Sequence, residues 1–213
     1  MNQEQKFGKF IVIEGGDGAG KTSVVNHLKE NFSLDWVFTR EPGGNELSDK
    51  IRSVILDPVS ENASADTLFL LFWASRVANL EKIVWPAIRS GKNVICDRFD
   101  ASTFAYQIRG QKNSHLVSLF ERFRHDFVSM LAPSFYIYLD VDPKVGKERA
   151  LASRCQDTNF FDEKDLEFYR RVREGYMEFF RSYTSGRYII IDANKSLSEV
   201  LTKVLCVVGD SID

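Results

Sequence analysis

The sequence predicts an α/β fold in which helices cover both faces of a five-stranded parallel sheet. Five short runs are apolar and rich in β-branched or aromatic residues. Most of them lack polar alternation, which is typical of strands buried on both faces. Helical patterns separate the runs, and this alternation indicates right-handed strand–helix–strand units. A glycine-rich motif stands between the first run and the first helical pattern. Together these observations favour a three-layer αβα arrangement.

The predicted strands are residues 10–13, 36–39, 93–96, 135–139 and 188–191. Each is followed directly by a charged residue: Glu14, Arg40, Asp97, Asp140 or Asp192. Because open α/β sheets bind ligands at the carboxyl ends of their strands, we expect the functional site at that edge. The predicted helices are residues 21–32, 47–57, 66–89, 101–109, 113–131, 143–154, 163–184 and 197–208.

Length and composition restrict the class of protein. At roughly 100–200 residues per domain, 213 residues without repeats or linkers predict a single domain over residues 1–213. The net charge of −2 shows no overall excess of positive charge of the kind that favours binding to nucleic acid. No apolar stretch approaches the roughly 18 residues of a membrane span, and no secretory signal is visible. Three widely spaced cysteines favour a reducing, cytoplasmic location without disulfides or zinc, with Cys96 and Cys206 expected in the core.

The strongest local signal fits G-x-x-x-x-G-K-[ST] between a strand and a helix, which is the context of a P-loop. Its residues are Gly15, Gly16, Asp17, Gly18, Ala19, Gly20, Lys21 and Thr22. Glycines let the backbone approach phosphate oxygens, and amide N–H groups at the helix N-terminus face the anion. Lys21 adds a positive charge for the β- and γ-phosphates of ATP, and the Thr22 hydroxyl can ligate Mg²⁺. The sequence therefore predicts a P-loop NTPase-type fold.

A carboxylate at a strand end could assist the metal. Asp97 is the predicted water-mediated partner of Mg²⁺, because it ends a buried strand. Asp140 is the alternative, although a helix cap or a salt bridge is the favoured interpretation of Asp140.

Two arginines indicate a second anion beside the P-loop. Arg98 follows Asp97, and Arg40 follows the second predicted strand. An arginine can grip a phosphate through its fork of donors, so these residues suggest an acceptor phosphate facing a donor nucleotide. The alternative is that the two arginines pair with Asp97 and Glu41. The sequence contains no Asn-Lys-x-Asp motif, with which a GTPase would recognise guanine.

Two residues of the long predicted helix could recognise a nucleobase. Phe72 and Arg76 are separated by four residues and share one helix face. An aromatic ring can stack on a base, and an arginine N–H beside it prefers the C4 carbonyl of thymine or uracil to the amine of cytosine. Taken alone, Phe72 fits a core position, but a cation on an apolar helix face needs a partner.

The chain resembles thymidylate kinases, of the nucleoside monophosphate kinase group, over nearly its whole length. The segments that carry the resemblance are residues 14–22, 40–44, 70–76, 97–107 and 168–173. The resemblance implies an enzyme that uses ATP and Mg²⁺ to convert dTMP to dTDP. It implies that Asp17 lies near the sugar 3′-OH and the metal. The other dTMP-binding residues that it implies are Arg40, Pro42, Phe72, Arg76, Arg98, Ser102, Thr103, Tyr106 and Gln107.

The resemblance also implies a lid, here residues 149–165, that brings an arginine to the transferred phosphate. This P-loop contains no arginine, so the lid must supply it. We expect Arg154 in that role and Arg149 against adenine. Where related bacterial sequences carry another arginine, this chain has Phe160 and Phe161. In the mechanism implied, Lys21, Arg98 and Mg²⁺ neutralise charge, and Asp17 and Asp97 support them.

Other functions stay open at the level of the sequence. The chain could be a kinase for another nucleoside monophosphate, or a P-loop switch that binds ATP without an acceptor. Arg98 and the pair of Phe72 and Arg76 count against a switch. A homodimer is implied by the resemblance alone, because the apolar residues of helices 66–89 and 113–131 could form either an interface or core.

Overall fold

The computed structural model describes residues 7–32, 36–153 and 164–211. Its parallel sheet has the strand order β2-β3-β1-β4-β5. The strands are β1 (Phe10–Gly15), β2 (Trp36–Arg40), β3 (Asn93–Asp97), β4 (Phe135–Asp140) and β5 (Tyr188–Asp192). The five predicted strands are confirmed, and each continues one or two residues further at its carboxyl end.

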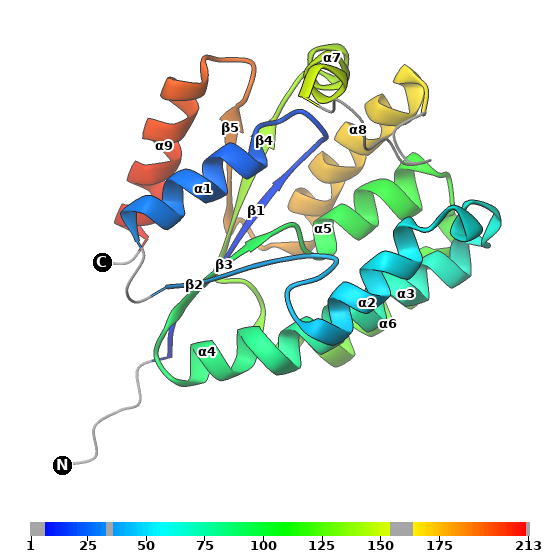
Figure 1. Ribbon diagram of the computed structural model, residues 1–213, viewed down its shortest axis with the longest axis horizontal. Coiled ribbons are helices and arrows are strands. Elements are labelled where there is room, and N and C mark those ends of the chain that lie inside the picture. Colours follow the sequence, from blue (N-terminus) through cyan, green and yellow to red (C-terminus); the bar gives the residue numbers. More distant parts are fainter. Residues whose placement is uncertain (1–6, 33–35, 154–163, 212–213) are drawn as a thin grey trace.

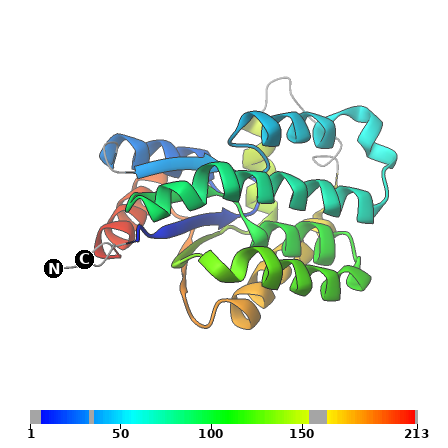
Figure 2. The same ribbon diagram turned by 90° about the horizontal axis from the view of Figure 1, so that it is seen from below.

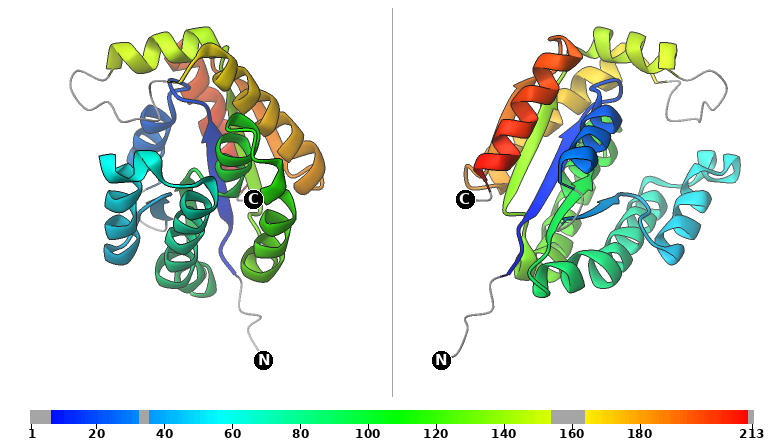
Figure 3. Two further views of the ribbon diagram at one scale, coloured as in Figure 1. Left: turned by 90° about the vertical axis from the view of Figure 1, so that its right-hand side faces the viewer. Right: turned by 60° about the vertical axis from the view of Figure 1, so that its left-hand side comes forward.

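Helices cover both faces of the sheet, which confirms the three-layer α/β prediction (Figures 1 and 3). One face packs against α1 (Lys21–Asn31) and α9 (Leu197–Asp210). The other faces α3 (Ala65–Asn79), α4 (Trp85–Arg89), α5 (Asp100–Thr103), α6 (Val117–Phe123) and α8 (Leu166–Tyr183). Strand side chains alternate between the two cores, because successive residues of a strand point to opposite faces. Ile11 and Ile13 therefore enter one core, and Phe10 and Val12 the other.

Three predicted helices contain π-helical turns, which widen a helix locally. The helix predicted over 66–89 consists of α3, the π-helical segment Leu80–Val84 and α4, which run on as one rod (Figure 2). The π-helical segment Phe104–Gly110 follows α5 directly along the chain. The helix predicted over 113–131 is divided into Ser114–Leu116, α6, Arg124–Val128 and Ser129–Leu131. The remaining helices, α2 (Glu46–Leu56) and α7 (Pro143–Ser153), begin and end close to their predicted bounds.

A short 3₁₀ helix, Pro58–Asn62, was not predicted. Asp57, placed inside a helix by the sequence pattern, instead caps this turn by accepting a hydrogen bond from the Val59 N–H at 2.8 Å. Pro58 then supplies the fixed φ that suits a first helical position.

The aromatic residues of the two apolar helices lie mainly in the core. Trp73 packs edge-on against Phe120, with ring centroids 5.9 Å apart, and both are buried. Cys96 is buried as predicted, but the prediction for Cys206 is wrong, because its side chain is exposed. The buried stripe of α9 is Val200, Val204 and Val208, and Cys206 lies off that four-residue spacing. Within the described residues, we find no helix with the length and apolar content to cross a membrane.

Gly175 allows α8 to approach the π-helical segment closely. A Cβ at this position would lie 2.8 Å from Arg109 Cβ and 3.0 Å from Ala105 Cα. We therefore expect Gly175→Ala to lower the free energy of unfolding by about 1–2 kcal/mol, measured by urea denaturation. Gly209→Ala in α9 is the control, since no described heavy atom lies within 4 Å of its added Cβ. Equal losses in the two variants would contradict the packing argument.

Candidate functional site

The loop after β1 has the tight, glycine-dependent backbone expected of a P-loop, and we call it the cradle. Gly18 and Gly20 have φ values of 71° and 89°, in the left-handed region. A Cβ on Gly18 would lie 2.0 Å from the Gly146 carbonyl oxygen, so only glycine fits there. Lys21 Nζ donates to the carbonyl oxygens of Gly15 (3.0 Å) and Gly16 (2.8 Å). Burial, together with the charge of Arg98, lowers the pKa of Lys21 to about 8. An anion in the cradle would therefore relieve an unfavourable concentration of positive charge.

A cleft of about 790 Å³ opens at the carboxyl ends of the strands. It brings together most of the predicted phosphate-binding residues from four separate segments of the chain. The predicted residues that line it are Asp17, Gly18, Ala19, Gly20, Lys21, Thr22, Arg40, Asp97, Arg98 and Arg149. The geometry therefore places cations of the P-loop and of the second predicted anion site on the same cavity.

Arg98 connects the end of β3 to the P-loop. Its Nη2 lies 2.7 Å from Asp17 Oδ1. Its Nη1 donates to the Gly15 carbonyl (3.1 Å) and to the hydroxyls of Ser102 and Tyr176 (3.2 Å each). The Arg98 φ of 68° is strained for a residue with a side chain. Such strain persists where the surroundings enforce it, often at functional sites.

Arg98 and Arg40 form ion pairs that differ from those considered in the sequence analysis. Arg98 pairs with Asp17 rather than Asp97. Arg40 lies 3.4 Å from Asp49 of α2, with both side chains about half exposed, rather than pairing with Glu41. An exposed pair of this length contributes little to stability, so Arg40 can turn toward an anion at small cost.

Beneath Arg98 lies the buried carboxylate of Glu14, which the sequence marked only as a strand-end charge. Glu14 Oε1 accepts from the backbone N–H of Phe99 (2.8 Å), and Oε2 accepts from the Ser102 hydroxyl (2.7 Å). The Tyr176 hydroxyl of α8 donates to Glu14 Oε2 at 3.2 Å. Burial raises the pKa of Glu14 despite these donors. Sequence reasoning missed the role of Tyr176, whose place in an amphipathic helix indicates only a core position.

The residues predicted to recognise the base do not line the cleft, although several of them contact Arg76 or Arg98. Arg76 is buried, and its Nη2 donates to the Phe99 carbonyl (2.9 Å) and to Thr103 Oγ1 (3.0 Å). Phe72 is partly exposed, so it is not a fully buried core residue. The ring of Tyr106 lies 5.2 Å from the Arg98 guanidinium. Gln107 is buried on the same segment.

The partner of Arg76 is Glu41, from the loop after β2. Arg76 Nε lies 2.7 Å from Glu41 Oε2, and both side chains are almost fully buried. Burial raises the pKa of Glu41 to about 7, and the positive charge of Arg76 opposes that rise. Within the described structure, the Nη1 atom of Arg76 is buried and has no hydrogen-bond partner. An orphaned donor of this kind is costly unless an acceptor meets it.

Arg52 of α2 is a cleft residue that sequence analysis missed. Its Nη1 donates to the Pro42 carbonyl at 3.0 Å, and its side chain lines the cleft with Arg40 and Arg98. Burial, with the charges of these two arginines, lowers its pKa. The local pattern gave no signal, because a single arginine in an amphipathic helix is usually a solvated charge.

The residues predicted for a metal fit such a site in part. Thr22 and Asp97 line the same cleft, and Asp97 Oδ1 is a buried acceptor without a hydrogen-bond partner among described atoms. Asp140 instead forms a two-fold contact with Arg173, with both N–O distances 2.7 Å, which confirms the salt-bridge interpretation. No group of three or more His, Cys, Asp or Glu side chains that could hold a metal ion occurs in the described ranges.

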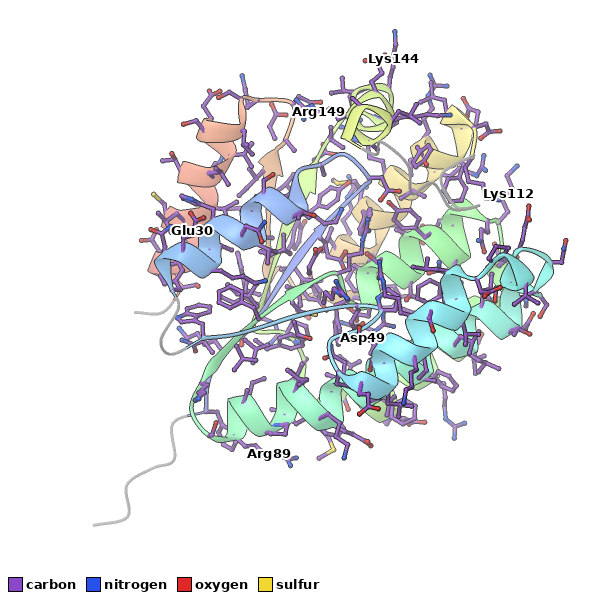
Figure 4. All side chains as sticks on the ribbon, viewed as in Figure 1. Glu30, Asp49, Arg89, Lys112, Lys144 and Arg149 are labelled. Atoms are coloured by element: carbon purple, nitrogen blue, oxygen red, sulfur yellow. The ribbon has the colours of Figure 1, made fainter. Side chains whose placement is uncertain are left out.

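Arg149 lies at the end of the cleft nearest β5 (Figure 4). Its Nη1 donates to the Ala193 carbonyl at 2.6 Å, which joins α7 to the segment after β5. Arg154, the predicted lid arginine, lies outside the described residues, as do Phe160 and Phe161.

Comparisons with known proteins agree with this geometry. The family model described as Thymidylate kinase matches residues 13–204. The chain belongs to the thymidylate kinase family. It is 38% identical to a thymidylate kinase of Geobacillus sp. (strain WCH70), over 97% of this chain and 98% of that relative. It is 37% identical to one of Clostridium novyi (strain NT), over 92% and 96%.

A solved structure shows the same fold. The crystal structure of thymidylate kinase from Ehrlichia chaffeensis superposes with a TM-score of 0.75 at 28% identity, and the match covers 95% of this chain and 99% of that chain. The match confirms the P-loop NTPase-type α/β fold. The cradle, the cleft and the Arg98 network thus belong to a thymidylate kinase fold over nearly its full length.

The hydroxyl of Tyr176 joins α8 to the P-loop and Arg98. We expect Tyr176→Phe to lower the free energy of unfolding by about 1–3 kcal/mol, because Glu14 and Arg98 would lose a buried partner. Tyr183→Phe on the same helix is the control, since the Tyr183 hydroxyl contacts exposed Glu121. Urea denaturation of both variants measures the difference, and no difference would show that the hydroxyl does not support this network.

Proposed function

We propose that this chain transfers the γ-phosphoryl group of ATP to dTMP, producing ADP and dTDP for dTTP synthesis. Family membership supports an ATP-dependent thymidylate kinase. The observation that carries the proposal is the position of Arg98, which lines one cleft with the P-loop. A P-loop protein that only binds ATP has no need of a second group of cations facing the cradle.

Most of the proposed ligand contacts in the cleft are to phosphate groups. Residues 15–22 would hold ATP, with Lys21 leaving the Gly15 and Gly16 carbonyls for the β- and γ-phosphates. Arg98, Arg40 and Arg52 would hold the phosphate of dTMP from the other end. The attacking group is already a phosphate oxygen, so positioning and charge neutralisation do the work. Asp17 would turn from Arg98 to the sugar 3′-OH.

The deoxynucleoside would lie on α3 and the segment 100–110. Phe72 would stack on thymine, and the free Nη1 of Arg76 would donate to its C4 carbonyl. Tyr106 would lie against C2′ and disfavour a 2′-OH. The remaining contacts of the pocket would come from Pro42, Ser102, Thr103 and Gln107.

Mg²⁺ is the cofactor that the cleft would take with ATP. The Thr22 hydroxyl would bind it directly and Asp97 through water, since Oδ1 of Asp97 is a buried acceptor with no partner in the described structure. The ion would supply positive charge at the β- and γ-phosphate oxygens.

Closure, assembly and location complete the proposal. Residues 149–165 would act as a lid within one kinase domain over residues 1–213, with Arg149 near adenine and Arg154 at the transferred phosphate. A homodimer would use the apolar helices predicted over residues 66–89 and 113–131, on which Leu70 and Met130 are exposed. The free thiols of Cys96 and Cys206 support a reducing, cytoplasmic setting.

ADP release tests the reaction directly. With ATP and Mg²⁺, we expect turnover with dTMP to exceed that with dCMP by at least about tenfold in kcat/KM, because a hydrogen bond to a carbonyl discriminates against an amine. AMP and GMP should also be poorer acceptors by at least about tenfold, because their purine rings are larger and both carry a 2′-OH. Turnover with dUMP tests whether the thymine methyl contributes. A preference for dCMP or a purine would overturn the thymine assignment and favour a kinase for another nucleoside monophosphate.

Replacing Arg98 separates a kinase from an ATP-binding switch. We expect Arg98→Ala to lower kcat/KM for dTMP by about 10²–10³-fold, because the acceptor phosphate loses its charged grip. The dissociation constant of ATP, measured by calorimetry, should change by less than about threefold. Arg122→Ala, on an exposed face of α6, is the control. Undiminished turnover in Arg98→Ala would favour the switch.

A further inference from the structure

Glu41 is the one residue of the described structure that both lines the phosphate cleft and pairs with Arg76. Its two carboxylate oxygens have different partners. Oε2 accepts from Arg76 Nε at 2.7 Å, and Oε1 accepts from Asn79 Nδ2 at 3.3 Å. Asn79 Oδ1 in turn accepts from the Thr39 hydroxyl of β2 at 2.8 Å. The carboxylate is therefore held between a strand of the sheet and helix α3.

The guanidinium of Arg76 is fixed on every side but one. Glu41 holds Nε, and the Phe99 carbonyl and Thr103 hydroxyl hold Nη2. The rings of Trp73 and Phe99 lie 4.6 and 5.1 Å from its central carbon. Of its three nitrogens, only Nη1 has no partner among the described residues. Because a guanidinium is planar, fixing Nε and Nη2 determines the direction of the Nη1 donors.

We propose that Glu41 is a positioning residue for pyrimidine selection, which holds the Arg76 guanidinium so that Nη1 faces the C4 substituent of the bound base. The inference rests on the proposed function, in which Arg76 reads that substituent. Glu41 touches no reacting atom in this account. Its effect reaches the base through Arg76, and its place on the cleft joins base recognition to the loop that carries Arg40.

A structural role alone predicts something different. A buried ion pair often adds little net stability, because desolvation offsets the attraction between the charges. Loss of a merely structural pair would weaken the enzyme equally toward every acceptor. Without a positioning carboxylate, the Arg76 guanidinium could rotate. Rotation would weaken the directed hydrogen bond from Nη1 to the base far more than it would weaken nonspecific contacts. The ratio of activities toward thymine and cytosine nucleotides therefore distinguishes the two roles.

The test compares Glu41→Gln with the wild-type chain at pH 8. We expect KM for dTMP to rise about tenfold, KM for ATP to stay within about twofold, and the ratio of kcat/KM for dTMP over dCMP to fall about tenfold. Asn79→Ala loosens the same carboxylate without removing its charge, and should lower that ratio about threefold. It supplies the measurement if Glu41→Gln does not fold.

Asp140→Asn is the matched control. Asp140 is a largely buried carboxylate at the end of β4, whose two oxygens each lie 2.7 Å from an Arg173 nitrogen, and neither residue lines the cleft or contacts Arg76 in the described structure. It should cost stability but leave the dTMP over dCMP ratio unchanged. A ratio unchanged in Glu41→Gln and Asn79→Ala, or lowered equally in Asp140→Asn, would overturn the inference. A wild-type chain that does not prefer dTMP to dCMP would instead overturn the proposed function.

Discussion

The arrangement of the site depends on one ion pair, between Arg98 at the end of β3 and Asp17 in the P-loop, with an N–O distance of 2.7 Å. β1 and β3 are neighbours in the sheet, and Asp97 is paired in register with Ile13. The residues that follow the two strands therefore emerge side by side. The left-handed backbone of Arg98 turns its side chain back over the P-loop. A nucleotide phosphate entering the cleft would compete with Asp17 for the same donors.

Burial of charge is the second constraint on this site. Glu14, Glu41 and Arg76 are all buried, and none is stable there without partners. Each carboxylate is held by donors from distant segments, which joins those segments at the carboxyl edge of the sheet. Three groups would gain partners from a ligand: Lys21, which donates to backbone carbonyls, and two atoms without a partner among the described residues, Nη1 of Arg76 and Oδ1 of Asp97.

The fold was predictable because its signals are local and repeated. Doubly buried strands look apolar throughout, and the P-loop motif has a fixed place between a strand and a helix. The π-helical turns were not predictable, because the local sequence pattern looks the same as that of an α-helix; one of them, Phe104–Gly110, packs closely against Gly175 of α8. Cys206 is exposed although α9 is rich in apolar residues, because the buried positions of α9 are those at the four-residue spacing of Val200, Val204 and Val208.

Most residues that line the cleft were predictable from the sequence, but their pairings were not. Asp17, Arg98 and Asp97 were found from strand ends and motif spacing. Arg98 pairs with Asp17 and Arg40 with Asp49, and these pairings depend on the turn of the chain after each strand. Arg52 and Tyr176 gave no signal, because one arginine or tyrosine in an amphipathic helix matches solvated or core positions equally well.

A crystal structure with dTMP and a non-hydrolysable ATP analogue tests the central claim most directly. The account predicts that the Arg98 guanidinium leaves Asp17 and donates to the phosphate of dTMP, within hydrogen-bond distance, while Lys21 leaves its carbonyls for the ATP analogue. An intact contact between Arg98 and Asp17, with the dTMP phosphate bound elsewhere, would contradict it.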